Sequence, residues 1–260
     1  MKLLVSVVSA EEARRAVAGG ADIIDVKDPL EGALGAPSPR VLSEVVGVVG
    51  DAAPVSVALG DVPGLPHTAA LAARGASGIG ADYVKVGLRG VHELDSAVAL
   101  LSAVAGAVGP GVAVVAATYA DAGALDPPAL TPGCLPALVQ RTGIAGALID
   151  TFTKDGRGLY GWMSESEVAD LIAGTRAAGA SFAVAGQLRL DDFRRVAADV
   201  VGVRSAVCRG GDRAAELESE LVAAAVAELR GGGRRCDCAG AGFAGCFGEP
   251  VPCQRVDHQS

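Results

Sequence analysis

The chain has 260 residues, 50% of them hydrophobic, which is enough for one large core and indicates a single domain. Its formal net charge is −8 at pH 7, and only 3% of its residues are aromatic. This acidic balance argues against nucleic-acid binding, since little is available for phosphate pairing or base stacking. No apolar run reaches the length that spans a bilayer, so we expect a cytoplasmic protein outside the membrane.

Short apolar segments alternate with helical patterns from the first residues onward. The predicted strands are residues 3–7, 22–27, 55–59, 83–88, 112–117, 147–151, 182–185 and 200–204. The predicted helices are residues 10–19, 40–49, 68–79, 93–108, 135–142, 164–178, 191–198 and 214–229. Ser9 with Glu12, and Ser164 with Glu167, have the spacing of a capping box at two of these helix starts.

Alternating buried strands and helices predict a (β/α)8 TIM barrel over residues 1–230, because parallel strands need crossover helices between them. The alternative is an open doubly wound sheet. Against it, the pair Gly19 and Gly20 closes the first helix and does not open it, so the dinucleotide-binding fingerprint is missing.

Residues 231–260 are rich in glycine and cysteine and lack periodicity, so we expect a disordered C-terminal extension. A metal site there is an alternative, but the spacing of its cysteines and His258 fits no paired CxxC arrangement. His67 and His92 show no ligand spacing either. We therefore predict no metal.

The lysines are the most informative residues. Of 22 basic residues only Lys2, Lys27, Lys85 and Lys154 are lysine, and the rest are arginine. Lys27 ends the second predicted strand, Lys85 lies in the fourth and Lys154 follows the sixth, and alternate strands of a barrel share one interior layer. The three amines are therefore predicted to meet where barrel active sites lie.

Two carboxylates join these amines. Asp25 shares a strand face with Lys27, and Asp150 lies near the end of the sixth strand. Burial and neighbouring ammonium groups would lower the pKa of one lysine, so that its amine attacks a carbonyl. The alternative is a set of structural ion pairs at the barrel mouth. Tyr119 and Asp121 either contact the substrate or cap the barrel.

A second group of residues predicts phosphate binding. Gly186 follows the seventh strand, and Arg204, Ser205, Gly210 and Gly211 follow the eighth. Barrels commonly bind phosphate at these two loops, where glycine exposes backbone N–H groups and arginine adds a charged fork. The alternative is turn glycines beside solvated arginines.

Four segments resemble the (5-formylfuran-3-yl)methyl phosphate synthase family, namely IIDVKDPLEGALGA at 23–36, DYVKVGL at 82–88, LIDTFTKDG at 148–156 and VGVRSAVCRGGDR at 201–213. The resemblance runs from Met1 to about Arg230. It implies a barrel enzyme, classed as a carbon–oxygen lyase, that makes the furan precursor of methanofuran. The cysteine-rich segment after Arg230 has no counterpart in the family.

The resemblance also implies roles for individual residues. Lys27 matches the Schiff-base lysine and Lys85 the proton acceptor, while Lys154, Asp25 and Asp150 match supporting charged residues. The implied reaction condenses two molecules of glyceraldehyde 3-phosphate, a small phosphorylated aldehyde, without an organic cofactor. A homo-oligomer is also expected.

Two other functions remain open. A class I aldolase would share the Schiff base and keep both phosphates. A non-catalytic barrel that binds phosphorylated metabolites is the alternative from another class.

Overall fold

The computed structural model describes residues 1–126 and 129–231. The predictions for the cysteine-rich segment and His258 fall on residues 232–260, outside the described residues.

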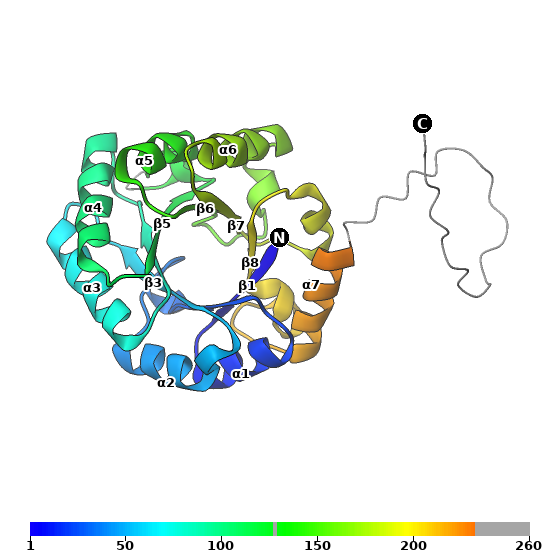
Figure 1. Ribbon diagram of the computed structural model, residues 1–260. Helices are drawn as coiled ribbons and strands as arrows, with labels where there is room; N and C mark the ends of the chain where they lie inside the picture. Colours follow the sequence, from blue (N-terminus) through cyan, green and yellow to red (C-terminus); the bar gives the residue numbers. More distant parts are fainter. Residues whose placement is uncertain (127–128, 232–260) are drawn as a thin grey trace, which may run out of the picture.

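Eight parallel strands close into a barrel in which each strand pairs with its neighbours in chain order. They lie at the centre of the view down the barrel in Figure 1. The strands are β1 (Lys2–Val7), β2 (Ile23–Val26), β3 (Val55–Asp61), β4 (Tyr83–Gly87), β5 (Ala113–Tyr119), β6 (Gly146–Asp150), β7 (Ser181–Val184) and β8 (Val200–Val203). The predicted (β/α)8 barrel is confirmed, and the open-sheet alternative is wrong.

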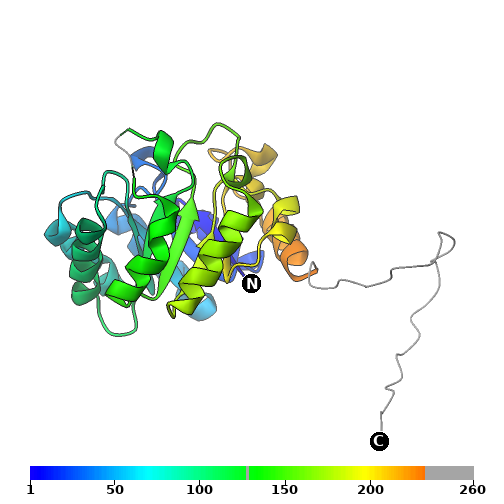
Figure 2. The same cartoon turned by 90° about the horizontal axis from the view of Figure 1, so that it is seen from above.

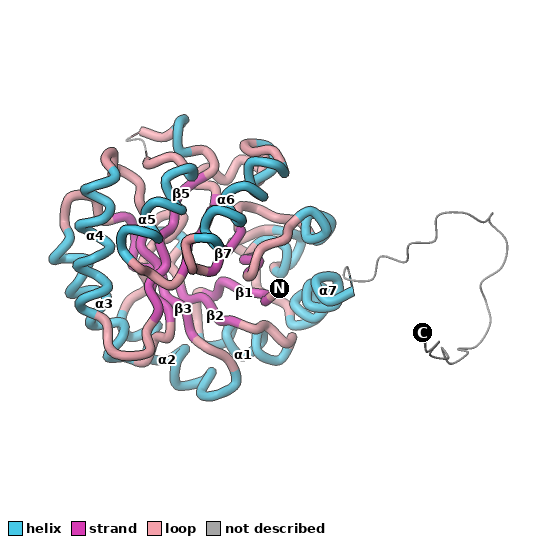
Figure 3. The backbone as a smooth tube through the Cα atoms, turned by 45° about the horizontal axis from the view of Figure 1, so that its top comes forward, coloured by secondary structure: helices cyan, strands magenta, loops and turns pink. Residues whose placement is uncertain are grey.

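The α-helices form a ring outside the strands, as Figures 2 and 3 show from two further directions. They are α1 (Ala10–Ala18), α2 (Pro39–Val49), α3 (Pro66–Ile79), α4 (Leu94–Ala107), α5 (Leu135–Thr142), α6 (Glu165–Ala177) and α7 (Ser219–Gly231). Within residues 1–126 and 129–231, none of the helices has both the length and the apolarity that a membrane crossing requires.

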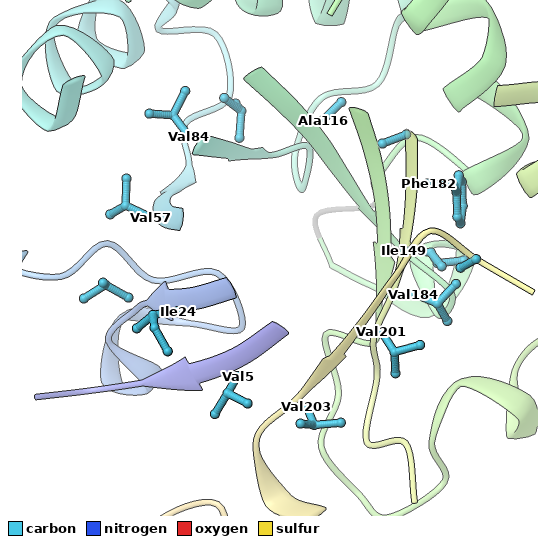
Figure 4. Packing of buried hydrophobic residues seen from close by; sticks show 14 of the residues in the cluster. Val5, Ile24, Val57, Val84, Ala116, Ile149, Phe182, Val184, Val201 and Val203 are labelled. Atoms are coloured by element: carbon cyan, nitrogen blue, oxygen red, sulfur yellow. The ribbon is translucent and has the colours of Figure 1, made fainter. Parts of the chain in front are cut away.

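The strands separate two environments because their side chains alternate in direction. Outward residues such as Val5, Ile24 and Val57 are buried in the layer between strands and helices. Figure 4 shows part of this layer against the strands. On the other side, Ser6, Asp25 and Ser56 are register partners on β1, β2 and β3 and line the cavity inside the barrel. Polar side chains thus enter the barrel interior while an apolar layer holds it closed.

Two predicted helices differ from the observed ones. The segment expected as a helix at 191–198 is a 3₁₀ helix, Leu190–Arg195. It ends because the backbone becomes extended at Val196, where Val196 and Ala198 are buried beside the barrel. The last helix was expected from residue 214 and begins at Ser219, because Leu217 first forms an antiparallel bridge with Cys208.

Gly19 tests the packing of α1 against α7. A Cβ at Gly19 would lie 2.5 Å from Val222 Cβ and 2.7 Å from the Ser219 carbonyl oxygen. We expect Gly19→Ala to lower the free energy of unfolding by about 1–3 kcal/mol through overpacking. Gly47, on the exposed side of α2, is the matched control: nothing lies within 4 Å of its Cβ position, so Gly47→Ala should stabilise by about 0.5–1 kcal/mol. Equal denaturation midpoints for the two variants would contradict the close α1–α7 contact.

Candidate active site

A cavity inside the barrel is lined by the five charged residues expected to be catalytic, namely Asp25, Lys27, Lys85, Asp150 and Lys154. They come from three alternate strands and their loops: β2 ends just before Lys27, β4 contains Lys85, and β6 ends at Asp150. The structure therefore brings together three amines and two carboxylates that are spread over half of the sequence.

Asp25 and Lys85 form the first of two buried ion pairs. Lys85 Nζ lies 2.6 Å from Asp25 Oδ1, and the two side chains are 5% and 1% exposed. Ser6, the register partner of Asp25 on β1, donates its hydroxyl to Asp25 Oδ2 at 3.0 Å. The Lys85 contact lacks hydrogen-bond geometry, so Asp25 Oδ1 accepts no hydrogen bond within the described part of the chain. Although Asp25 lies only two residues before Lys27, its ion-pair partner is Lys85 on β4.

Asp150 and Lys154 form the second pair. Lys154 Nζ donates to Asp150 Oδ1 at 2.8 Å, to the Thr151 carbonyl at 2.5 Å and to Thr151 Oγ1 at 3.2 Å. All three ammonium hydrogens have acceptors, so Lys154 is held as a cation. Burial alone would raise the pKa of Asp150, but Lys154 and Lys27, together with the Thr151 amide, hold that pKa below its usual range.

Lys27 is the amine left over. Its side chain is buried, and among the described residues no carboxylate lies within ion-pairing distance of its Nζ. Burial lowers the pKa of Lys27 to about 8, with Lys85 and Lys154 lowering it further and Asp150 and Asp25 opposing them. At pH 7 roughly a tenth of such an amine is neutral, against roughly one part in 3,000 at the ordinary pKa. A buried amine with a lowered pKa is the kind of group that can attack a carbonyl, so the role expected of Lys27 is compatible with its surroundings and stays a prediction.

The residues expected to bind phosphate divide into two groups. Gly186, Arg204 and Ser205 line the same cavity as the lysines. Gly210 and Gly211 are exposed and do not line it. Gly186 has φ of 104°, and a Cβ there would lie 3.1 Å from the Thr151 backbone nitrogen, so only glycine brings β7 this close to the end of β6.

Arg204 lines the cavity, but most of its hydrogen bonds go to the protein. Its guanidinium pairs with both carboxylate oxygens of Glu12 and also donates to the carbonyls of Ser6 and Arg213. These contacts occupy most of the N–H donors of Arg204, so few are left to bind a phosphate. The direct phosphate contact expected of Arg204 stays a prediction. Instead, the pair ties Arg204, directly after β8, to α1 at the edge of the cavity.

Arg213, which was not among the candidates, also lines the cavity. It is half-buried, and within residues 1–126 and 129–231 its guanidinium has no hydrogen bond or ion pair. Arg213 thus shares the cavity with the lysines and has a guanidinium without a partner among the described residues. Arg213 is the last residue of the RGGDR segment, so the sequence contained a signal for it. The sequence did not show that Glu12 occupies Arg204 and leaves Arg213 as the cavity's arginine without a partner in the described part of the chain.

Tyr119 and Asp121 cap the barrel and do not line the cavity. The Tyr119 hydroxyl is 2.9 Å from each carboxylate oxygen of Asp61, and its ring packs edge-on against Phe152 at 5.5 Å between centroids. Asp121 accepts the amides of Phe152 and Thr153 at 2.8 Å each. Both residues thus support the loop after β6 that carries Lys154.

The described residues contain no group of three or more His, Cys, Asp or Glu side chains arranged to hold a metal ion. His67 and His92 are exposed on the outside of the barrel.

Comparison with known proteins identifies the family. Residues 3–226 match the family model described as 4-HFC-P synthase. The chain belongs to this family. A curated relative from Methanosarcina mazei, named (5-formylfuran-3-yl)methyl phosphate synthase, is 42% identical over 236 residues, which are 88% of this chain and 100% of the relative. A relative of the same name from Methanocaldococcus jannaschii is 42% identical over 85% of this chain and 97% of its own length.

Solved structures place the 4-HFC-P synthase fold among other barrels. Phosphoribosyl anthranilate isomerase from Thermus thermophilus superimposes with a TM-score of 0.59 at 16% identity, covering 89% of this chain and 99% of that one. Orotidine 5′-phosphate decarboxylase from Pyrococcus horikoshii superimposes with the same TM-score and identity, over 88% and 99% of the two chains. At this identity the likeness concerns the fold alone.

The pair formed by Glu12 and Arg204 allows a stability test. We expect Glu12→Ala to lower the free energy of unfolding by about 3–5 kcal/mol, because it leaves a buried guanidinium uncompensated. Glu12→Ala combined with Arg204→Met should recover part of that loss, since neither charge is then buried alone. Denaturant unfolding of the single and double variants measures both. A loss below ~1 kcal/mol for Glu12→Ala would show that Arg204 is free to serve the cavity.

Proposed function

We propose that this family member condenses two molecules of glyceraldehyde 3-phosphate through an imine on Lys27. The product would be 4-(hydroxymethyl)-2-furancarboxaldehyde phosphate, with release of one phosphate and two molecules of water. The names of the relatives support the furan phosphate as product. The observation that carries the imine is the buried, unpaired amine of Lys27 between two ion pairs.

The first step is attack of the neutral Lys27 amine on the aldehyde carbon. The carbinolamine loses water to give an iminium ion, whose positive charge acidifies the adjacent carbon. Asp150 and Asp25 stabilise the cation once it forms, since both carboxylates favour positive charge at Lys27. The same two carboxylates that limit the fall of the Lys27 pKa thus favour the iminium.

The second step is proton transfer from that carbon to Lys85. Lys85 becomes the neutral base by giving its ammonium proton to the hydroxyl that leaves the carbinolamine as water, and Asp25 at 2.6 Å stabilises the ammonium again once the proton from carbon arrives. The electron pair passes into the enamine. The enamine carbon attacks the aldehyde of the second molecule or expels the phosphate on the next carbon, and the expulsion breaks a carbon–oxygen bond as in a lyase. Lys154, held as a cation beside Asp150, offers positive charge to the departing phosphate.

Phosphate release on mixing with glyceraldehyde 3-phosphate tests this proposal. We expect phosphate and a furan chromophore to appear together, and borohydride added during turnover to leave an adduct on the peptide containing Lys27. Lys27→Arg should abolish the adduct and lower kcat by at least about 10³-fold, because an arginine side chain does not form an imine. Lys2→Arg, a change of the same kind at an exposed site on β1, is the control.

The other outcomes separate the alternatives. Aldol product without phosphate would indicate a class I aldolase, and binding without turnover would indicate a phosphometabolite-binding barrel. An adduct on Lys85 or Lys154 in place of Lys27 would overturn the assignment of the nucleophile.

The rate of imine formation should rise with pH through about 8. A lysine whose pKa is lowered gains its neutral, nucleophilic form as the pH passes the lowered value, well below the ordinary 10.5. Borohydride trapping over a pH series, with Lys27 adduct quantified by mass spectrometry, measures the midpoint. A midpoint near 10 would show that the amine is not perturbed.

Arg213 is proposed as the charged contact for a substrate phosphate, with Gly186 and Ser205 beside it. We expect Arg213→Ala to raise KM by roughly 10-fold or more, the value of one charged hydrogen bond, with a smaller change in kcat. Arg209→Ala is a matched control on the same loop, because Arg209 is exposed and pairs with Glu218. Equal KM values for the two variants would remove Arg213 from the site.

A further inference from the structure

Gln187 has an unusual backbone conformation at the edge of the cavity. Its φ is 51°, and it is the one non-glycine residue with positive φ within residues 1–126 and 129–231. A glutamine in this left-handed region is strained, and such strain persists where the surroundings hold it in place. Gln187 follows β7 directly after Gly186 and lines the cavity together with Lys154.

The side chain of Gln187 binds the backbone of the loop on both sides of Lys154 in the sequence. Its Oε1 accepts the Gly156 amide at 3.1 Å, and its Nε2 donates to the Thr153 carbonyl at 3.3 Å. Both ends of the amide are therefore used on the short stretch that contains Lys154. The strained backbone is what directs this side chain back towards the loop after β6.

Neighbouring contacts show that this loop is fastened at both ends and that Gln187 holds its middle. Asp121 holds the amides of Phe152 and Thr153 at the start. The Leu159 amide donates to the Gly186 carbonyl at 2.8 Å at the far end. Between them lies Gly156, which has φ of 88° and, as a glycine, more conformations open to its backbone than any other residue. Gln187 holds its amide.

We propose that Gln187 is a positioning residue that holds the loop after β6 and so keeps the Lys154 ammonium against Asp150 and in front of Lys27. The inference rests on the proposed use of Lys27 as the imine-forming amine. Without the clamp, Lys154 would spend part of its time turned towards solvent. Two effects on Lys27 would follow, both in the same direction: less repulsion from the Lys154 ammonium, and more attraction from an unpaired Asp150.

The charged groups that line the cavity with Lys27 come from alternate strands and the loops after them. They are Asp25 on β2, Lys85 on β4, Asp150 and Lys154 on β6 and its loop, and Arg204 and Arg213 on the β8 side. Of these, only Lys154 depends on Gln187 for the position of its backbone. A change at Gln187 therefore reaches Lys27 through Lys154 and Asp150.

The test is the pH dependence of Lys27 acetylation by limiting acetic anhydride, quantified on the Lys27 peptide by mass spectrometry without substrate. Two variants are compared: Gln187→Ala removes the amide and keeps the strain, whereas Gln187→Gly removes the amide and relieves it. In both we expect the labelling midpoint to move from about 8 upwards by roughly 0.5–1 pH unit, because the Lys27 ammonium is better stabilised. Gln140→Ala, on the exposed face of α5, should leave the midpoint unchanged.

Labelling needs no turnover, so its result stands whether or not the chain makes a furan phosphate. An unchanged midpoint in Gln187→Gly overturns the positioning role, even if the melting temperature falls. A shift confined to Gln187→Ala also overturns it, since backbone strain and not the amide would then be responsible. A shift in both variants, with phosphate-releasing activity absent from the wild type, would keep the positioning role and reject the proposed reaction.

Discussion

The dominant constraint on the site is that three amines and two carboxylates are buried together inside one barrel. An isolated charge in such an interior costs several kcal/mol even after the structure relaxes, so each buried ion needs a partner. Lys85 takes Asp25 and Lys154 takes Asp150, which leaves Lys27 without a carboxylate of its own. The pKa of Lys27 is lowered to about 8, so its neutral form is more populated than that of an ordinary lysine. The lowered pKa of Lys27 thus follows first from its burial and then from three amines sharing one cavity with two carboxylates.

Much of this could be predicted from the sequence because the relevant signals are local. Strand and helix periods located all eight strands, and the scarcity of lysine singled out the three amines before any geometry was known. The barrel fold then predicted that the three amines lie close together, since β2, β4 and β6 contribute side chains to the same interior layer. The roles of Lys27 and Lys85 came from the family resemblance, and they stay predictions. What the structure adds is the pairing, with Asp25 turned to Lys85 and not to Lys27.

Other features could not be predicted, because they depend on contacts between distant segments. Glu12 has the spacing of a capping-box residue with Ser9, and Ser9 does accept the Glu12 amide. However, the Glu12 carboxylate accepts the Val8 amide and holds Arg204, 192 residues further along the chain. Periodicity likewise ended β3 and β5 two residues early, which hid the contact between Asp61 and Tyr119. By contrast, the Ser164–Glu167 box is entirely local, and both of its hydrogen bonds are present.

The pairing of Arg204 also bears on how an acidic protein attracts an anionic substrate. The chain carries a formal charge of −8, which would repel a phosphorylated aldehyde at long range. At the mouth the balance is reversed: Glu12 neutralises Arg204, the two aspartates neutralise two lysines, and Lys27 and Arg213 remain. Lys27 follows β2 and Arg213 lies in the loop after β8, and these two strands are the neighbours of β1 in the barrel. A phosphate bound at Arg213 would therefore hold the rest of the same molecule in the cavity that Lys27 also lines.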